Sequence, residues 1–192
     1  MLVMLVCICL VSCGSSSGSG SSPAEDLPEE LEKYKGILSH IYNGGYFRLT
    51  LPDGYWAQNS TSEADPEGKA LIYTVNDELR ELAISMDGEF DPDWYNVWIF
   101  DEHDAYDTKT AFEAYEEWKE YGDPNDTGFY ELNPDGLDVT VYVVMHGKDY
   151  FKTAFAFIDN PDSGQAYISA GLWNADMEEA FFNAINNLEY VK

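Results

Sequence analysis

Apolar and polar residues alternate along much of the chain after residue 45, which predicts a series of β-strands. The clearest run is residues 137–146, with apolar side chains at every second position from Leu137 to Met145. Short turn sequences such as Pro52-Asp53-Gly54, Asn76-Asp77 and Gly147-Lys148 separate neighbouring strands and predict antiparallel pairing. The other expected strands are residues 46–51, a stretch beginning at Tyr55, and residues 70–75, 81–86, 95–100, 128–132, 150–158 and 166–172.

Apolar residues recur at helical spacing in three further segments. Residues 26–43 have Pro28 near the start and Gly44-Gly45 at the end. Residues 110–121 begin with Thr110 and Glu113, which are placed to form a capping box. The last helix is expected from Asp176, whose side chain can cap it. Its buried side is expected to carry Met177, Phe181, Ala184, Ile185 and Leu188. These elements predict an α+β fold, a single antiparallel β-sheet of about six to seven strands flanked by helices.

We interpret the N-terminal segment as an export signal rather than as part of the folded domain. Residues 1–12 are apolar and uncharged, and they are shorter than the ~20 residues that a membrane-spanning helix needs. Leu10-Val11-Ser12-Cys13 resembles the lipobox of bacterial lipoproteins, which implies cleavage after Ser12 and acylation of Cys13 with fatty acids such as palmitate. Cys7 and Cys9 fit this pattern less well, because bulky residues precede them. The resemblance implies an extracytoplasmic protein, anchored to the bacterial membrane through this lipid only.

A flexible tether is expected directly after Cys13. Residues 14–22 contain only Gly and Ser, so residues 13–25 are interpreted as the anchor and its spacer, and residues 26–192 as one folded domain. No Lys or Arg precedes the apolar run, so the true start is expected upstream or the chain has been shortened. The alternative is a fragment of a transmembrane helix with an unrelated cysteine.

Two segments of the domain resemble PsbP-like domains. Residues 47–55 read Phe-Arg-Leu-Thr-Leu-Pro-Asp-Gly-Tyr, which is similar to the strand and acidic-Gly-aromatic turn that open those domains. Residues 178–188 are similar to their closing helix. The resemblance implies an antiparallel sheet with helices on its faces and a binding or assembly role. It carries no catalytic residue over to this chain.

The charge of the chain restricts its partners. There are 36 acidic and 10 basic residues, a formal net charge of -26. Nucleic acid and anionic lipid surfaces would be repelled, whereas cations or a basic partner would be attracted. A well-solvated surface with no further role is the alternative. All three cysteines lie within the first thirteen residues, so the domain can contain neither a disulfide nor a thiolate metal site.

One acidic cluster has the composition of a divalent-cation site. Asp101, His103, Asp104 and Asp107 surround Glu102 between a predicted strand and a predicted helix. The alternative is that they solvate this connection. The segment from Asp123 to Gly128 imitates the start of a calcium loop, but Pro134 stands where the bidentate Glu is required, so we interpret it as a turn. Residues 159–164 are expected to form a hairpin turn.

The aromatic residues suggest a binding groove. Trp94 and Trp98 share one face of the strand at 95–100, and Trp118 lies on the helix at 110–121. Packing of that helix on that strand is the simplest interpretation. The alternative is a partly open groove for a sugar, peptide or apolar ligand, to which Trp56 and Trp173 could contribute.

No catalytic signature is present, so three hypotheses remain. The first is a lipid-anchored, non-enzymatic module that binds a protein or small ligand. The second is a divalent-cation-binding module at the 101–107 cluster, and a divalent cation is the one cofactor that the sequence suggests. The third is a hydrolase. No Ser or His motif of known catalytic spacing occurs, so such an enzyme would have to use scattered carboxylates.

Overall fold

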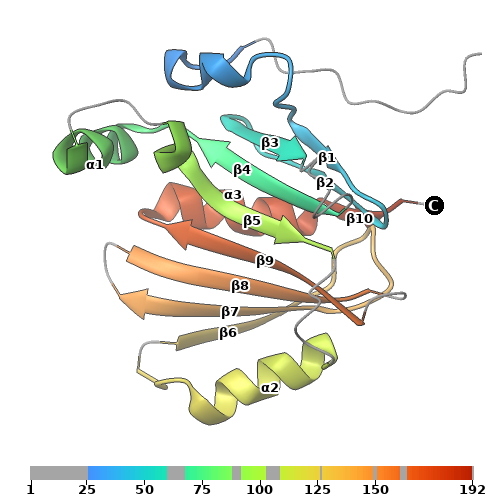
Figure 1. Ribbon diagram of the computed structural model, residues 1–192. Coiled ribbons are helices and arrows are strands. Elements are labelled where there is room, and N and C mark those ends of the chain that lie inside the picture. Colours follow the sequence, from blue (N-terminus) through green and yellow to red (C-terminus); the bar gives the residue numbers. More distant parts are fainter. Residues whose placement is uncertain are drawn as a thin grey trace, which may run out of the picture.

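The structure is a computed structural model, and it describes residues 26–59, 68–87, 92–102, 109–125, 127–148, 151–160 and 164–191. These residues form an α+β fold with a large antiparallel sheet, a small second sheet and helices (Figure 1). The predicted class is therefore confirmed. The prediction of a single sheet is wrong, because the chain divides its strands between two.

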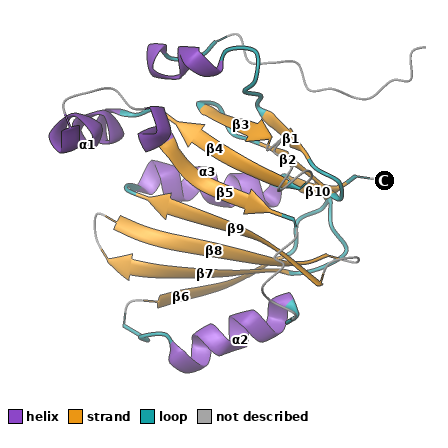
Figure 2. Ribbon diagram, in the orientation of Figure 1, coloured by secondary structure: helices purple, strands orange, loops and turns teal. Residues whose placement is uncertain are grey.

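The large sheet has seven strands in the order β3-β4-β5-β9-β8-β7-β6, and each strand is antiparallel to its neighbours. The sheet twists strongly from β3 to β6 (Figure 2). Its strands are β3 (Tyr55–Asn59), β4 (Lys69–Thr74), β5 (Asn96–Asp101), β6 (Thr127–Leu132), β7 (Val141–Lys148), β8 (Phe151–Asn160) and β9 (Gly164–Leu172).

The small sheet joins the two ends of the domain. Its order is β1-β2-β10, with β1 (Ile41–Asn43), β2 (Phe47–Thr50) and β10 (Leu188–Tyr190). Arg48 of β2 pairs with Glu189 of β10 at 2.7 Å. Because β10 follows the last helix, this pairing holds the C-terminal end of the domain against its first strands.

Three α-helices and two short 3-10 helices occur among the described residues. They are α1 (Asp77–Asp87), α2 (Ala111–Tyr121), α3 (Ala175–Asn186), and the 3-10 turns at Glu29–Tyr34 and Pro92–Tyr95. In Figure 1, α3 lies behind the large sheet and α2 lies along its lower end, at β6 to β8. None of these helices has the length and apolar character that crossing a membrane requires.

The main core lies between the large sheet, α3 and the small sheet. Phe181 of α3 is fully buried and meets the ring of Trp98 edge-on, with centroids 5.7 Å apart. Small residues of β8 and β9, including Ala156 and Ala170, belong to the same cluster and leave room for such large rings. The predicted buried residues Met177, Phe181, Ala184 and Ile185 are buried on α3. Leu188 is also buried, but it belongs to β10 rather than to the helix. Burial of each large apolar side chain contributes about 1.5–3 kcal/mol.

A second, smaller apolar cluster covers the opposite face of the sheet. It consists of Ala111, Ala114 and Tyr115 of α2 packed on Val144 and Phe157. Alternate residues of β7 therefore face opposite cores: Val143 and Met145 belong to the main core, whereas Val144 packs under α2. This two-sided burial explains why Tyr142 and Val144, at positions between the alternating residues of the main core, are also apolar.

Two predicted elements are wrong. The helix expected at 26–43 is a 3-10 helix, Glu29–Tyr34, followed by β1. The backbone leaves the helical region at Lys35, whose ψ is 129°, and turns at Gly36, whose φ is +82°. Ser39 then exchanges backbone hydrogen bonds with Ala57, so strand pairing replaces the helical turn. The strand expected at 81–86 is part of α1. Asn76 caps that helix by accepting a hydrogen bond from the amide of Leu79 at 2.9 Å. The Asn76-Asp77 pair, predicted to form a turn between strands, therefore begins a helix.

Smaller corrections concern element ends. The strand expected at 137–146 begins at Val141, and Gly147-Lys148 lie within β7 rather than forming a turn. The last helix is capped by Asn174, which accepts from the amide of Met177, and not by Asp176. The capping box of Thr110 and Glu113 is confirmed. The hairpin expected at 159–164 is also confirmed, since Asn160 pairs with Gly164.

Candidate binding site on helix α2

Two of the five tryptophans lie deep in the main core. Trp98 is 1 % exposed and stacks on Tyr55 with centroids 4.7 Å apart. Trp56 is also buried, and its ring lies 5.7 Å from that of His40. Burial raises the pKa of Tyr55 to about 12, which agrees with a ring closed off from solvent. Neither indole is positioned to contact a ligand on the surface.

Trp94 and Trp173 are half-buried and pack against the same core. Trp173 leans on Phe151, 4.9 Å between centroids, and covers Gly171, where a Cβ would come within 2.7 Å of the indole. The structure therefore does not bring the five tryptophans into one groove. The expected packing of residues 110–121 on residues 95–100 is also wrong, because α2 lies over β7, β8 and β9.

The acidic cluster proposed as a cation site is only partly described. Asp101 ends β5 and forms an ion pair with Lys69 of the neighbouring strand at 3.5 Å. His103, Asp104 and Asp107 lie outside the described residues. Within the described part of the chain, no group of three His, Cys, Asp or Glu side chains is placed to hold a metal ion. The cation site thus stays a prediction.

Glu102, in the middle of that acidic sequence, has a role that the sequence did not reveal. Its side chain is completely buried and accepts hydrogen bonds from the amides of Gly45, Tyr46 and Phe47 at 2.9–3.0 Å. Asn160, also buried, donates to its backbone carbonyl at 2.7 Å. The carboxylate thereby fastens the β1–β2 turn of the small sheet to the end of the large one.

Gly44 makes this attachment sterically possible. A Cβ at that position would lie 1.7 Å from Glu102 Oε1 and 2.3 Å from the Tyr42 hydroxyl oxygen. The Gly44-Gly45 pair, predicted from the sequence to end a helix, forms the turn that receives the carboxylate. The signal that could have found it is the spacing of Trp98, Phe100 and Glu102, because Glu102 directly follows β5 and continues the two-residue alternation of the buried residues Trp98 and Phe100.

An open groove runs between α2 and the outer face of β8. Its helical wall consists of residues at positions i, i+3, i+4 and i+7, which share one side of a helix. Its volume is about 320 Å³. The lining residues are Ala114, Glu117, Trp118, Tyr121 and Phe157. Trp118 is the predicted ligand-binding tryptophan that borders this groove.

The position of α2 is fixed at its start and along its length. Asp159 of β8 accepts a hydrogen bond from the amide of Ala111 at 2.7 Å, where the helix dipole favours a carboxylate. Tyr115 packs edge-on to Phe129 of β6, 5.7 Å between centroids. Trp118 stacks on Phe155 of β8 at 5.5 Å. The indole is thus held by the sheet on one side while its other side borders the groove.

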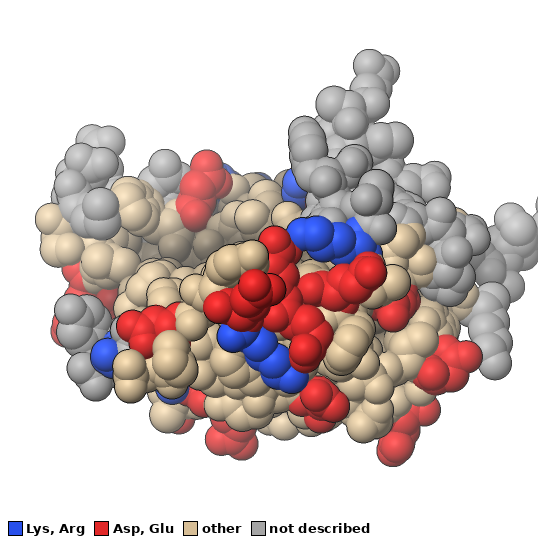
Figure 3. Space-filling model, turned by 90° about the horizontal axis from the view of Figure 1, so that it is seen from below, with Lys and Arg blue, Asp and Glu red and all other residues tan. Residues whose placement is uncertain are grey.

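The solvent side of α2 is acidic and also exposes aromatic rings. Tyr121 is 75 % and Phe112 48 % exposed. Four glutamates face two lysines here, so four negative and two positive charges leave a net charge of -2. The acidic residues are Glu113, Glu116, Glu117 and Glu120, and the basic ones are Lys109 and Lys119. Figure 3, seen from the α2 side, shows Asp and Glu side chains gathered with few basic residues between them.

These charges interact mainly with one another. Lys119 pairs with Glu116 at 2.8 Å, and this hydrogen bond raises the pKa of the lysine. Lys109 contacts the carboxylate of Glu117. Hydrogen bonds from the backbone and side chain of Thr110 lower the pKa of Glu113. Because all of these groups are well exposed, their pairing is weak and exchanges readily with other charges.

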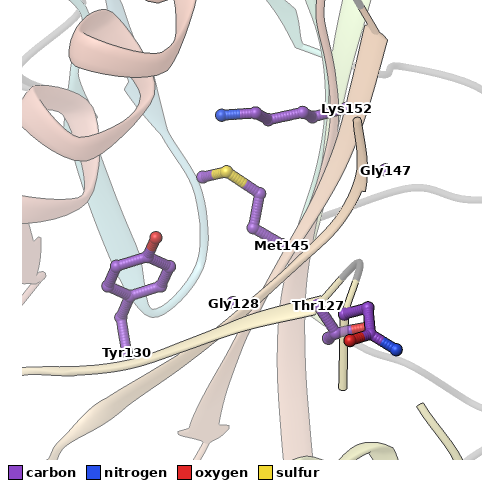
Figure 4. Close-up of a pocket in the computed structure, with 7 residues that line it drawn as sticks. Thr127, Gly128, Tyr130, Met145, Gly147 and Lys152 are labelled. Atoms are coloured by element: carbon purple, nitrogen blue, oxygen red, sulfur yellow. The ribbon is translucent and has the colours of Figure 1, made fainter. Parts of the chain in front are cut away.

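A second hollow, of about 220 Å³, lies on the other face of the sheet at the ends of β6 and β7. Tyr130, Met145 and Lys152 extend into the same space beside Gly128 and Gly147 (Figure 4). The Lys152 ammonium is bound by Glu178 of α3 at 2.6 Å. This pair is less exposed than the Lys109–Glu117 pair of α2 and exchanges less readily with other charges, so we favour the α2 groove as the binding site.

Comparison of the chain with protein-family models, with curated protein sequences and with solved structures finds no match.

Proposed function

We propose that this protein is a lipid-anchored extracytoplasmic module without enzymatic activity, which binds a basic protein partner through α2. The observation that carries the proposal is the groove beside α2, lined by Trp118, Tyr121 and Phe157 and bordered by glutamates. Aromatic residues are enriched at the energetic centres of protein interfaces. Acidic surroundings select and attract a partner of opposite charge.

The orientation of the domain supports this role. The 3-10 turn Glu29–Tyr34, which follows the tether, lies at the opposite end of the large sheet from α2 (Figure 1). A domain held to the membrane through Cys13 and residues 14–25 therefore presents α2 away from the anchored end.

The PsbP-like resemblance adds support of a general kind. This resemblance implies an antiparallel sheet with helices on its faces, and it implies a binding or assembly role. The separate small sheet β1-β2-β10 departs from the single sheet that we expected. We therefore propose the likeness for residues 45–190 at the level of architecture and function class.

Replacement of Cys13 by Ser tests the anchor. The wild-type chain expressed in bacteria is expected in the membrane fraction and labelled by radioactive palmitate, whereas Cys13→Ser is expected to lose both properties, because the two remaining cysteines, Cys7 and Cys9, follow bulky residues and do not fit the lipobox. Cys9→Ser is the matched control and should keep both. A Cys13→Ser protein that still takes up palmitate would contradict the proposed anchor.

Neutralising the glutamates of α2 tests the binding surface. Octa-arginine is the probe, and the full chain is solubilised in dodecyl maltoside, a nonionic detergent. Replacing Glu113, Glu116, Glu117 and Glu120 by Gln is expected to weaken binding about 10-fold at low salt, by removing several exposed charge pairs. Gln at position 113 can still complete the capping box, so the helix should persist.

A matched control separates this surface from the general negative charge. The control changes four exposed acids elsewhere by the same net charge: Glu29→Gln, Glu81→Gln, Asp135→Asn and Glu179→Gln. It is expected to weaken octa-arginine binding by less than about 3-fold, because separated surface charges are largely screened. Equal effects of the two quadruple variants would contradict binding at α2.

A further inference from the structure

We infer that the groove between α2 and β8 holds a single cationic side chain, arginine or lysine, from a basic segment of the partner protein. This inference rests on the proposed function and names the chemistry of recognition at the same surface. It follows from the kind of residues that line the groove: three aromatic rings and one carboxylate around about 320 Å³. Such an arrangement is how proteins recognise ammonium and guanidinium groups.

The lining gives each part of a cationic side chain a partner. Phe157, nearly buried, belongs to the sheet beneath the helix, and Trp118 and Tyr121 contribute rings from consecutive turns of α2. The face of each ring carries negative electrostatic potential that attracts a cation. Glu117 at the edge supplies a full charge. The methylene stem of Lys or Arg can rest on the same apolar surface.

The protein already shows both contacts with its own lysines. Lys109 contacts the carboxylate of Glu117, which lies 50 % exposed at the groove. One turn away, the Nζ of Lys119 lies 4.2 Å from the centroid of the Tyr115 ring. Because the Lys109–Glu117 pair is a surface ion pair, a partner cation can replace Lys109 at small cost.

Other occupants fit this groove less well. The segment that precedes the domain cannot supply the cation, since no Lys or Arg occurs before Lys33. A second copy of the chain would bring another net charge of -26 and would present the same acidic helix. An anionic lipid surface is repelled by the same glutamates. A basic segment of another protein is the occupant with complementary charge.

Substitutions of Tyr121 provide the sharpest test, because this ring is exposed and its replacement should not disturb folding. In the full chain in dodecyl maltoside, Tyr121→Leu is expected to weaken octa-arginine binding about 2- to 5-fold, the contribution of one exposed cation–π contact. Tyr121→Phe keeps the ring and should bind as wild type. Trp118→Leu and Trp118→Phe form a second pair with the same expected order. Octa-lysine should show the same ranking.

A small cation gives an independent measurement. At the same concentration, and hence the same ionic strength, tetramethylammonium chloride is expected to displace more octa-arginine than sodium chloride, and Tyr121→Leu should remove the difference. If the Leu variants bind as wild type while the four-glutamine variant of α2 is still weakened, the groove inference is overturned and the proposed function stands. If octa-arginine does not bind, or the two quadruple variants behave alike, the proposed function itself fails.

Self-association is checked in the same samples. Sedimentation of the full chain is expected to show one protomer per micelle for wild type and Tyr121→Leu alike. A wild-type dimer that Tyr121→Leu dissociates would overturn the inference, because the groove would then be filled by a second copy.

Discussion

Replacing Glu102 by Ala is expected to destabilise the domain by about 3–5 kcal/mol, measured by urea unfolding followed by circular dichroism. The carboxylate is fully buried and accepts from three backbone amides in the β1–β2 turn. Its removal leaves the buried amide of Phe47 and the partly buried amides of Gly45 and Tyr46 without this acceptor, and it leaves a cavity where the side chain lay. Because this turn belongs to the small sheet, the loss should also loosen β1, β2 and β10.

Asp101→Ala is the matched control for this prediction. Asp101 is the preceding residue, also acidic, but its carboxylate pairs with Lys69 across the large sheet. Loss of that pair should cost less than about 1 kcal/mol. Glu102→Gln should lie between the two, because its amide oxygen can still accept while its NH₂ group faces other donors. Equal stabilities for Glu102→Ala and Asp101→Ala would contradict the fastening role.

Trp98→Ala is expected to cost about 3–5 kcal/mol of unfolding free energy, the usual loss when a large buried aromatic is truncated. The indole is 1 % exposed and lies between Tyr55 and Phe181, so its removal opens a cavity between β3, β5 and α3. Differential scanning calorimetry and urea unfolding provide the measurement. Octa-arginine binding at a temperature where the variant remains folded should be unchanged, because Trp98 lies in the main core.

Two further variants show which part of the Trp98 ring stabilises the fold. The indole N–H has no hydrogen-bond partner within the described part of the chain. Trp98→Phe therefore sacrifices volume but no hydrogen bond, and about 1–2 kcal/mol is the expected cost. Trp118 is half-buried and lines the α2 groove, so Trp118→Ala should weaken octa-arginine binding while lowering the free energy of unfolding less than Trp98→Ala does. A Trp98→Ala protein as stable as wild type would contradict the assignment of this ring to the core.

Strands were predictable from the sequence where the alternation of apolar residues met a sheet with one well-defined inner face. Strand β9 is an example, because Ala166, Ile168, Ala170 and Leu172 are buried in alternation and the residues between them are only partly buried. The helix expected at 26–43 failed because its apolar spacing was considered without Gly36, whose φ of +82° excludes continued helix. The α1 segment failed for the opposite reason: a short alternating run outweighed the cap formed by Asn76. In both cases a single residue outside the apolar pattern determined the local structure.

The candidate site was predictable only in part. Trp118 could be placed on a helix with Tyr121 because their spacing is helical, but Phe157 joins them from a strand about 40 residues away, a contact that periodicity cannot reveal. Nothing in local sequence distinguishes Trp98 from Trp118, since both lie on apolar faces. The role of Glu102 could not be predicted either, because the backbone amides that it binds lie more than 50 positions earlier in the chain.

Fluorine NMR of the five tryptophans would test most directly whether α2 forms the binding surface. The full chain, labelled with 5-fluorotryptophan and solubilised in dodecyl maltoside, gives one resonance per indole, each assigned by a single Trp→Phe variant. On addition of octa-arginine, we expect the Trp118 resonance to shift while those of Trp56 and Trp98 stay in place. A stationary Trp118 resonance, with any other indole shifting instead, would contradict binding at α2.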